Sequence, residues 1–270
     1  MNVSRVINNI YWRLQKIIVP TLRNSYFLYE DVLKSCVNPE MRWLDLGCGH
    51  QILPAWFPNS EERQLSLIRN CKTIVGIDYD LNSLRNHNCL SLKTRGCIDR
   101  LPFKDGSFDL VTANMVVEHL KNPEAVFKEV SRILSPEGIF IIHTTNTLSY
   151  LTAIGSLTPR KWKKKLISFV DGRDEEDVFG VYHRANTSRR IRSLAKMSGL
   201  NAAQIRMVVT SAQFRVLFPF VIFELLWIKI LMTKLCKQMR TNIIAILKKQ
   251  GSNLEDSISR DSAPCCGISV

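Results

Sequence analysis

The chain has 270 residues, of which 46% are hydrophobic, and carries 37 Lys and Arg against 24 Asp and Glu. This length is typical of one full-sized domain or two small ones, and the hydrophobic content is enough to bury a core. Composition therefore excludes a wholly disordered chain and a small disulfide-stapled scaffold. The net charge of +13 is uneven, because residues 1–150 contribute +2 and residues 151–270 contribute +11. A basic half suits nucleic acid, an anionic membrane surface or an acidic substrate.

The eight cysteines include no Cys-x-x-Cys pair, and no histidines cluster at the spacing of zinc ligands. We therefore expect no metal site, no disulfide framework and a cytoplasmic location. The first twenty residues lack the continuous apolar run of a signal peptide. Their apolar residues recur every three or four positions, which predicts an amphipathic helix within a helical cap over residues 1–40. This helix either packs on the domain or lies on a membrane.

From residue 42 to residue 146, short apolar runs alternate with helix-length polar stretches. Five runs predict a buried strand followed by a polar loop: RWLDLGCGH, TIVGIDYD, GCIDRLPF, SFDLVTANMVVEHL and GIFIIHTTN. Before the last run, Asn122 and Pro123 predict the start of a helix that Gly138 ends. Alternating strands and helices predict a parallel sheet covered on both faces, with ligands at the carboxyl ends of its strands.

The second half predicts a helix that ends at Gly199 and two strands, at residues 202–209 and 242–249. Between the strands, residues 216–235 are apolar but interrupted by charges at Glu224, Lys229 and Lys234, which scatter around a helix. A buried or cap-forming helix, membrane-surface contact and a true span all stay open, in that order of preference. The Ser-rich tail over residues 250–270 is expected to be disordered.

Acidic residues follow three successive predicted strands. In the first loop, Gly47 and Gly49 allow a tight turn close to a ligand, but the third glycine of a dinucleotide fingerprint is replaced by Ile52. Asp78 can accept from both hydroxyls of a ribose, or it can cap a helix that starts at Leu81. Asp99, placed at the end of the third strand, suits an exocyclic adenine amine. The three loops together predict a nucleoside site without a pyrophosphate.

With these motifs the sequence resembles the class I S-adenosylmethionine-dependent methyltransferases, particularly the branch with the ubiquinone and menaquinone methyltransferases. The resemblance covers WLDLGCG, GIDYD, DRLPFKDGSFDLV and VSRILSPEGIFIIHTTN, and resumes over residues 182–209 and 242–249. It implies a Rossmann-like three-layer α/β/α sandwich on a mostly parallel seven-stranded sheet with an antiparallel last strand. The methyltransferase domain would span residues 41–249, with cap insertions at about 147–200 and 212–240.

The resemblance also implies S-adenosyl-L-methionine as the cofactor. Its methionine end would be held by Asp45, Gly47 and Gly49, its ribose by Asp78 and its adenine amine by Asp99. The rest of the predicted cofactor-binding set comprises Tyr79, Arg100 and Asn114, the last at the end of the fourth strand. The chain departs from the family pattern at Gln51, where a third glycine is common, and in a lengthened stretch over residues 59–71.

The implied reaction is in-line methyl transfer to a small-molecule, glycan or lipid-type acceptor that is anionic or presented at an anionic membrane. A sulfonium methyl is already activated, so a general base is needed only for an acceptor protonated at neutral pH. Weak candidates for a catalytic role at the mouth of the site are His119, Tyr182 and His183. His143, within an apolar run, is expected to be a core histidine.

Two alternatives stay open. An RNA methyltransferase would explain the basic runs at residues 160–165 and 184–192, although no Asn-Pro-Pro-Tyr motif follows the fourth strand. A catalytically inactive cofactor-binding adaptor at a membrane surface would explain the charge, although the intact strand-end acids argue against it.

Overall fold

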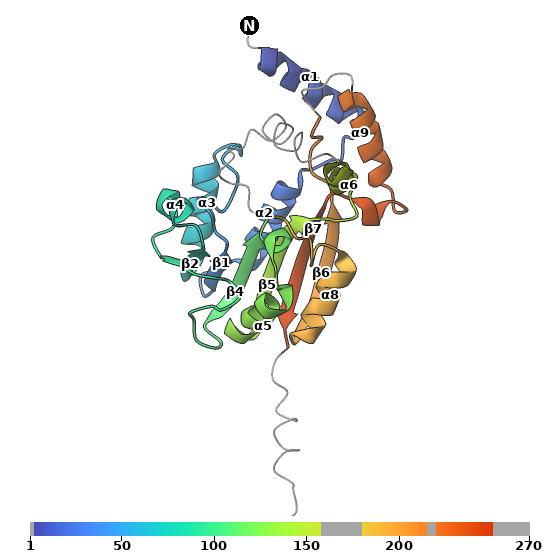
Figure 1. Ribbon diagram of the computed structural model, residues 1–270. Helices are drawn as coiled ribbons and strands as arrows, with labels where there is room; N and C mark the ends of the chain where they lie inside the picture. Colours follow the sequence, from blue (N-terminus) through green and yellow to red (C-terminus); the bar gives the residue numbers. More distant parts are fainter. Residues whose placement is uncertain (1–2, 158–179, 215–219, 251–270) are drawn as a thin grey trace, which may run out of the picture.

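Figure 1 shows a computed structural model that describes residues 3–157, 180–214 and 220–250. Seven strands form one sheet in the order β3-β2-β1-β4-β5-β7-β6. Their bounds are β1 Arg42–Leu46, β2 Thr73–Asp78, β3 Lys93–Arg95, β4 Phe108–Asn114, β5 Leu134–Thr145, β6 Leu200–Val208 and β7 Asn242–Lys249. The first five strands pair in parallel, whereas β7 is antiparallel to both β5 and β6. The predicted Rossmann-like sheet with an antiparallel last strand is therefore confirmed.

Helices cover both faces of the sheet. On one face lie α2 Ser25–Cys36, α3 Ser60–Arg69 and α4 Leu81–Asn86, and on the other lie α5 Pro123–Ile133 and α8 Ser188–Met197. Neighbouring residues of β1 show how one strand serves both faces, because Trp43 and Leu44 are both fully buried but in opposite layers. A parallel strand covered on both faces needs apolar side chains on both.

The strand order reverses between β1 and β4. From β1 the chain runs outward to β2 and β3 and then returns to β4 on the other side of β1. The loops that follow β1 and β4 consequently diverge to opposite faces, and such a reversal is where α/β proteins place their ligand-binding crevice, at the carboxyl edge of the sheet. The loops after β1, β2 and β4 all start at this edge.

Two predicted element ends were wrong. The third strand was misplaced, because β3 is Lys93–Arg95 and precedes the run GCIDRLPF that was predicted to form it; the Gly96 N–H makes a last bond to the Asp78 carbonyl and the chain then turns. The apolar Ile98 that suggested a strand packs against the core from that turn. The helix α5 ends at Ile133 instead of running to Gly138, since Pro136 cannot continue a helix.

The helix α8 lies within residues 182–209, where the resemblance resumes, and packs into the core beside β6, although the insertion predicted at about 147–200 also includes it. The basic run at residues 160–165 lies outside the described residues, as does the tail from residue 251.

A third cluster of apolar side chains joins α1 Val3–Ile18 to α9 Phe220–Leu231, next to α6 Tyr150–Leu157. Figure 1 shows these helices side by side beyond the end of the sheet from which β5 leads into α6. No helix among the described residues is long and apolar enough to cross a bilayer. The buried side of α9 carries Leu225 and Ile228, which pack with Tyr11 of α1.

The charges within residues 216–235 do not share one side of the helix, because Glu224 is buried on the inner side of α9 whereas Lys229 is exposed. Its carboxylate accepts hydrogen bonds from the Gln213 and Phe214 N–H groups at 2.8 Å and from the Tyr150 hydroxyl at 2.7 Å. One carboxylate thus ties together α9, α6 and the segment after β6. A buried acid with this many donors is satisfied, which is what its burial requires.

We predict that Glu224→Ala lowers the free energy of unfolding by about 2–4 kcal/mol, because it leaves three donors without their acceptor. Glu224→Gln keeps one acceptor oxygen and should cost less. Lys229→Ala, on the exposed side of the same helix, should change stability by less than about 0.5 kcal/mol. Urea denaturation of the three variants measures these differences. Equal losses for Glu224→Ala and Lys229→Ala would contradict the anchoring role.

Candidate functional site

The loop after β1 forms the centre of the site. Gly47 and Gly49 have positive φ angles of 58° and 54°, a conformation that favours glycine. A Cβ on Gly47 would lie 2.6 Å from Cγ2 of Val116, so the loop packs tightly against the turn after β4. A Cβ on Gly49 would meet nothing within 4 Å and would project into open space. The backbone of Gly49 is therefore accessible to a ligand from that side.

The carboxylate of Asp78, at the end of β2, is half-buried beside this loop. One of its oxygens accepts from the Gly49 N–H and the other from the Asp80 N–H, both at 2.8 Å. The capping alternative is wrong, because Asp80 is the residue that caps α4. A carboxylate has about four acceptor positions, so both oxygens of Asp78 keep capacity for the hydroxyls of a ribose.

Asp45 is buried under the glycine loop in a chain of hydrogen bonds. The Trp43 indole N–H donates to the Thr112 hydroxyl at 2.8 Å, and that hydroxyl donates to Asp45 at 2.6 Å. Burial raises the pKa of the Asp45 carboxyl to about 7, because desolvation outweighs the Thr112 hydrogen bond and the negative charge of Asp78 adds to it. The Asp45 carboxyl below the loop is thus buried and has a pKa near neutral pH.

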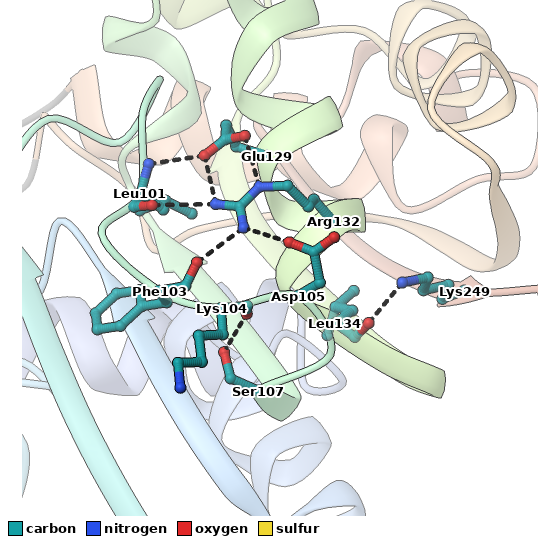
Figure 2. Close-up of polar contacts among 9 residues, drawn as sticks. All are labelled: Leu101, Phe103, Lys104, Asp105, Ser107, Glu129, Arg132, Leu134 and Lys249. Carbon is teal, nitrogen blue, oxygen red and sulfur yellow. Dashed lines mark hydrogen bonds and ion pairs between the residues drawn. The ribbon is translucent and has the colours of Figure 1, made fainter.

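Asp99 and Arg100 are exposed, in the turn that follows β3. Figure 2 shows how the next residues are held: Arg132 of α5 donates to the carbonyls of Leu101 and Phe103 and pairs with Asp105 and Glu129. Glu129 in turn accepts from the Leu101 N–H at 2.8 Å. This cluster fixes the chain immediately after Asp99, although none of its members was singled out from the sequence. Tyr79 is also exposed, and the Arg95 guanidinium lies 5.3 Å from its ring centre.

Asn114 ends β4 next to the glycine loop. Its amide donates to the Ile52 carbonyl at 3.3 Å, and its side-chain oxygen lies 2.9 Å from Nδ1 of His143. His143 is fully buried, and desolvation lowers its pKa to about 3, which keeps the ring neutral. The prediction of a core histidine is confirmed, since the ring supports Asn114 from within the sheet.

The structure brings together the three weak catalytic candidates. His119 lies in the short turn Val117–His119 after β4, and its Nδ1 is 3.2 Å from the Gly180 carbonyl. The N–H groups of Tyr182 and His183 both donate to the carbonyl of Glu118, at 2.8 and 3.1 Å. Lys121 and Arg184 approach the Tyr182 ring at 5.7 and 5.9 Å. The candidates therefore share one surface with two cations, and no proton-transfer geometry singles one out.

Sequence patterns missed the network that joins this surface to the sheet. The buried Glu118 carboxylate accepts from the Thr144 hydroxyl at 2.7 Å, and that hydroxyl accepts from the Asn186 amide at 2.7 Å. Asn186 also donates to the Thr145 carbonyl. Its members come from three distant segments, so no local motif announces them. One sign of this network is visible in the sequence, which is that a Glu, a Thr and an Asn stand next to apolar runs.

These residues fit the predicted cofactor. The loop whose backbone is open at Gly49 suits the amino-acid group of the cofactor. The half-buried Asp78 carboxylate, which can accept further hydrogen bonds, suits the ribose, and the exposed Asp99, on a turn held by Arg132, suits the adenine. Gly47 and Gly49 would hold the methionine end of S-adenosylmethionine, Asp78 its ribose and Asp99 its adenine. The buried Asp45 carboxyl would lie beneath the methionine end. The fold and these residues define a Rossmann-like nucleoside-binding site, although the individual contacts with the cofactor stay predictions.

Comparisons with known proteins agree with the predicted methyltransferase family. Residues 44–142 match the model of the family described as "Methyltransferase domain". A Mycolicibacterium smegmatis protein named "Probable S-adenosylmethionine-dependent methyltransferase" is 25% identical over 174 residues, covering 60% of this chain and 63% of the relative. An uncharacterized methyltransferase of Schizosaccharomyces pombe is 30% identical over 116 residues, covering 40% and 41% of the two chains. The chain thus spans less than two thirds of the length of these two relatives.

A solved structure shows the same fold. The S-adenosylmethionine-dependent methyltransferase of Mesorhizobium loti matches with a TM-score of 0.51 and 19% identity, covering 81% of this chain and 96% of that one. Residues 44–142 therefore match a methyltransferase domain on a sheet with the fold of the S-adenosylmethionine-dependent methyltransferases, and these similarities support S-adenosyl-L-methionine as the cofactor. Membership of the ubiquinone and menaquinone branch stays a prediction.

Substitutions of the two loop glycines should differ. In Gly47→Ala the positive φ costs about 1–2 kcal/mol, and the new methyl against Val116 adds about 1–3 kcal/mol. In Gly49→Ala only the cost of the positive φ angle applies, but the new methyl group would project into the space predicted for the ligand. We expect Gly47→Ala to be the less stable variant by urea denaturation, and Gly49→Ala to fold yet bind S-adenosylhomocysteine more weakly by calorimetry. A Gly49→Ala variant with unchanged affinity would place the ligand elsewhere.

The raised pKa of Asp45 predicts a pH dependence of stability. Between pH 4 and pH 7 the folded state holds a proton that the unfolded state has released, so the free energy of unfolding falls as pH rises through this window. The loss from this one group is about 4 kcal/mol. Asp45→Asn cannot titrate, so its stability relative to wild type should increase from pH 4 to pH 7 in urea denaturation. A constant difference between the two proteins across this range would contradict the buried acid.

Proposed function

We propose that the protein transfers a methyl group from S-adenosylmethionine to a small-molecule, glycan or lipid-type acceptor that is anionic or presented at an anionic surface. The observation that carries the proposal is the set of acids and glycines at the carboxyl edge of the sheet, on the β1–β3 side of the β1/β4 reversal. The cofactor supplies a methyl on a sulfonium, which is already activated for displacement. The protein then has to align the acceptor and exclude water.

The acceptor side supports an anionic group. Lys121 and Arg184 flank Tyr182 next to His119, and the net charge of residues 151–270 is +11. Cations at the entrance of a site attract and orient an anionic acceptor before any chemistry takes place. Because the sulfonium methyl is already activated, we propose that positioning of the acceptor dominates the rate.

Asp78→Asn tests the proposal. The substitution keeps the size of the side chain but places an amide next to the Asp80 N–H and removes the charge that favours hydroxyl donors. Affinity for S-adenosylhomocysteine should fall about 100-fold, which corresponds to roughly 3 kcal/mol of charged hydrogen bonds. Isothermal titration calorimetry measures the affinity, and transfer of labelled methyl into lipid, metabolite and RNA extracts identifies the acceptor class.

Asp31→Asn is the matched control, because Asp31 is an exposed acid of α2 that pairs with Arg23. It should bind S-adenosylhomocysteine like wild type. The proposal fails if wild type does not bind S-adenosylhomocysteine, or if Asp78→Asn binds as tightly as the control. Label entering only RNA would replace the proposed acceptor class with nucleic acid.

A further inference from the structure

The side of α9 turned away from its buried cluster is unusually apolar. Phe220 and Phe223 are 63% and 67% exposed, and Leu226 and Ile230 continue the same strip at three- and four-residue spacing. Leu225 and Ile228 occupy the opposite, buried side. A single exposed apolar residue needs no explanation, but a row of four on one helix marks a surface that is covered when the protein works.

The neighbouring helix α1 adds to this surface. Ile17 is 77% exposed, and Ile10 and Trp12 are also exposed, whereas Tyr11 points into the cluster shared with α9. The two helices pack side by side at one end of the molecule (Figure 1). We call the exposed sides of both helices, together with the adjoining residues 232–237, the α1–α9 outer face. Leu235, in that adjoining segment, is 96% exposed.

The charge of the outer face has one sign. Its exposed cations are Arg13, Lys16, Lys229, Lys234 and Lys237. Residues 3–23 contain no Asp or Glu, and residues 220–250 contain only Glu224, which is buried. No ion pair joins these five cations to another residue that the structure describes. Lysines and arginines around exposed aromatic and aliphatic side chains, without acids, are complementary to an anionic lipid bilayer.

We propose that the α1–α9 outer face docks the protein on the surface of an anionic membrane. Phe223, Leu226 and Ile230 would enter the headgroup region, while the lysines contact lipid phosphates and carboxylates. The 12-residue α9 is too short to span a bilayer, so the contact is peripheral. This inference does not depend on the proposed methyl transfer.

Charge also distinguishes this partner from others. A second copy of the chain, related by a two-fold axis, would set the same five cations against themselves without a compensating acid. A nucleic acid would satisfy the cations but would leave the aliphatic strip of α9 against water or phosphate. Only a surface with anionic groups over an apolar layer matches both features.

The position of the α1–α9 outer face indicates what docking would do for the predicted site. Tyr150 of α6 donates to Glu224 of α9, and α6 follows directly from the carboxyl end of β5. The docking face and the crevice at the β1/β4 reversal are therefore on the same end of the sheet. Docking would hold the acceptor side of the molecule close to the bilayer.

Vesicle co-sedimentation tests the proposal without any cofactor. Full-length protein is mixed with phosphatidylcholine vesicles, with or without about one-third phosphatidylserine, at low and high salt. We expect binding to the anionic vesicles at low salt and its loss at high salt. Lys229→Gln, Lys234→Gln and Lys237→Gln together should weaken binding on the order of 100-fold, at about fivefold for each lysine. The exposed-strip variant Phe223→Ser/Leu226→Ser/Ile230→Ser should weaken it at least about tenfold.

The matched control replaces three exposed lysines on other surfaces, Lys104→Gln, Lys128→Gln and Lys196→Gln, which removes the same charge. It should bind anionic vesicles like wild type, and unchanged melting temperatures of all variants show that they are folded. The proposal is overturned if wild type ignores anionic vesicles, if both outer-face variants still bind, or if the control loses as much. It is also overturned if the outer-face lysines are needed for RNA binding or self-association instead. Calorimetry with S-adenosylhomocysteine on the same samples separates a failure of docking from a failure of the proposed methyl transfer.

Discussion

The reversal of strand order between β1 and β4 is the constraint on which the site depends. It separates the loops after these strands, and the glycine loop and the half-buried Asp78 carboxylate lie beside this reversal. Gly47 keeps one wall of the crevice tight against Val116, and Asp78 fastens the next loop to Gly49. The predicted nucleoside site is therefore built from loops held by the sheet, and Arg132 of α5 fixes the third of these loops.

The uneven charge of the chain divides along the same architecture. The first half, which holds the glycine loop and the strand-end acids, is almost neutral, whereas the second half supplies Arg184 beside Tyr182 and the cations on and after α9. A buried carboxylate, Glu224, holds α9 and α6 together at the carboxyl edge. Binding of an anionic acceptor and docking on an anionic surface would thus use separate groups of cations on one end of the molecule.

Much of the fold could be predicted from sequence because it is encoded locally. Runs of apolar residues located every strand except β3, and Asn122 with Pro123 located the start of α5. The prediction failed at Asp99, since Ile98 packs partly buried against the core from a turn instead of a strand, and only long-range packing shows the difference. The Glu118–Thr144–Asn186 network and the inward position of Glu224 were also inaccessible, because their partners are 10 to 74 residues away.

The most direct test of the site is a crystal structure of the protein with S-adenosylhomocysteine. The geometry predicts the ribose hydroxyls at hydrogen-bonding distance from the Asp78 carboxylate, with the amino-acid end in front of Gly49 and the adenine near Asp99. A ligand bound away from the β1/β4 crevice, or one whose ribose does not contact Asp78, would contradict this assignment.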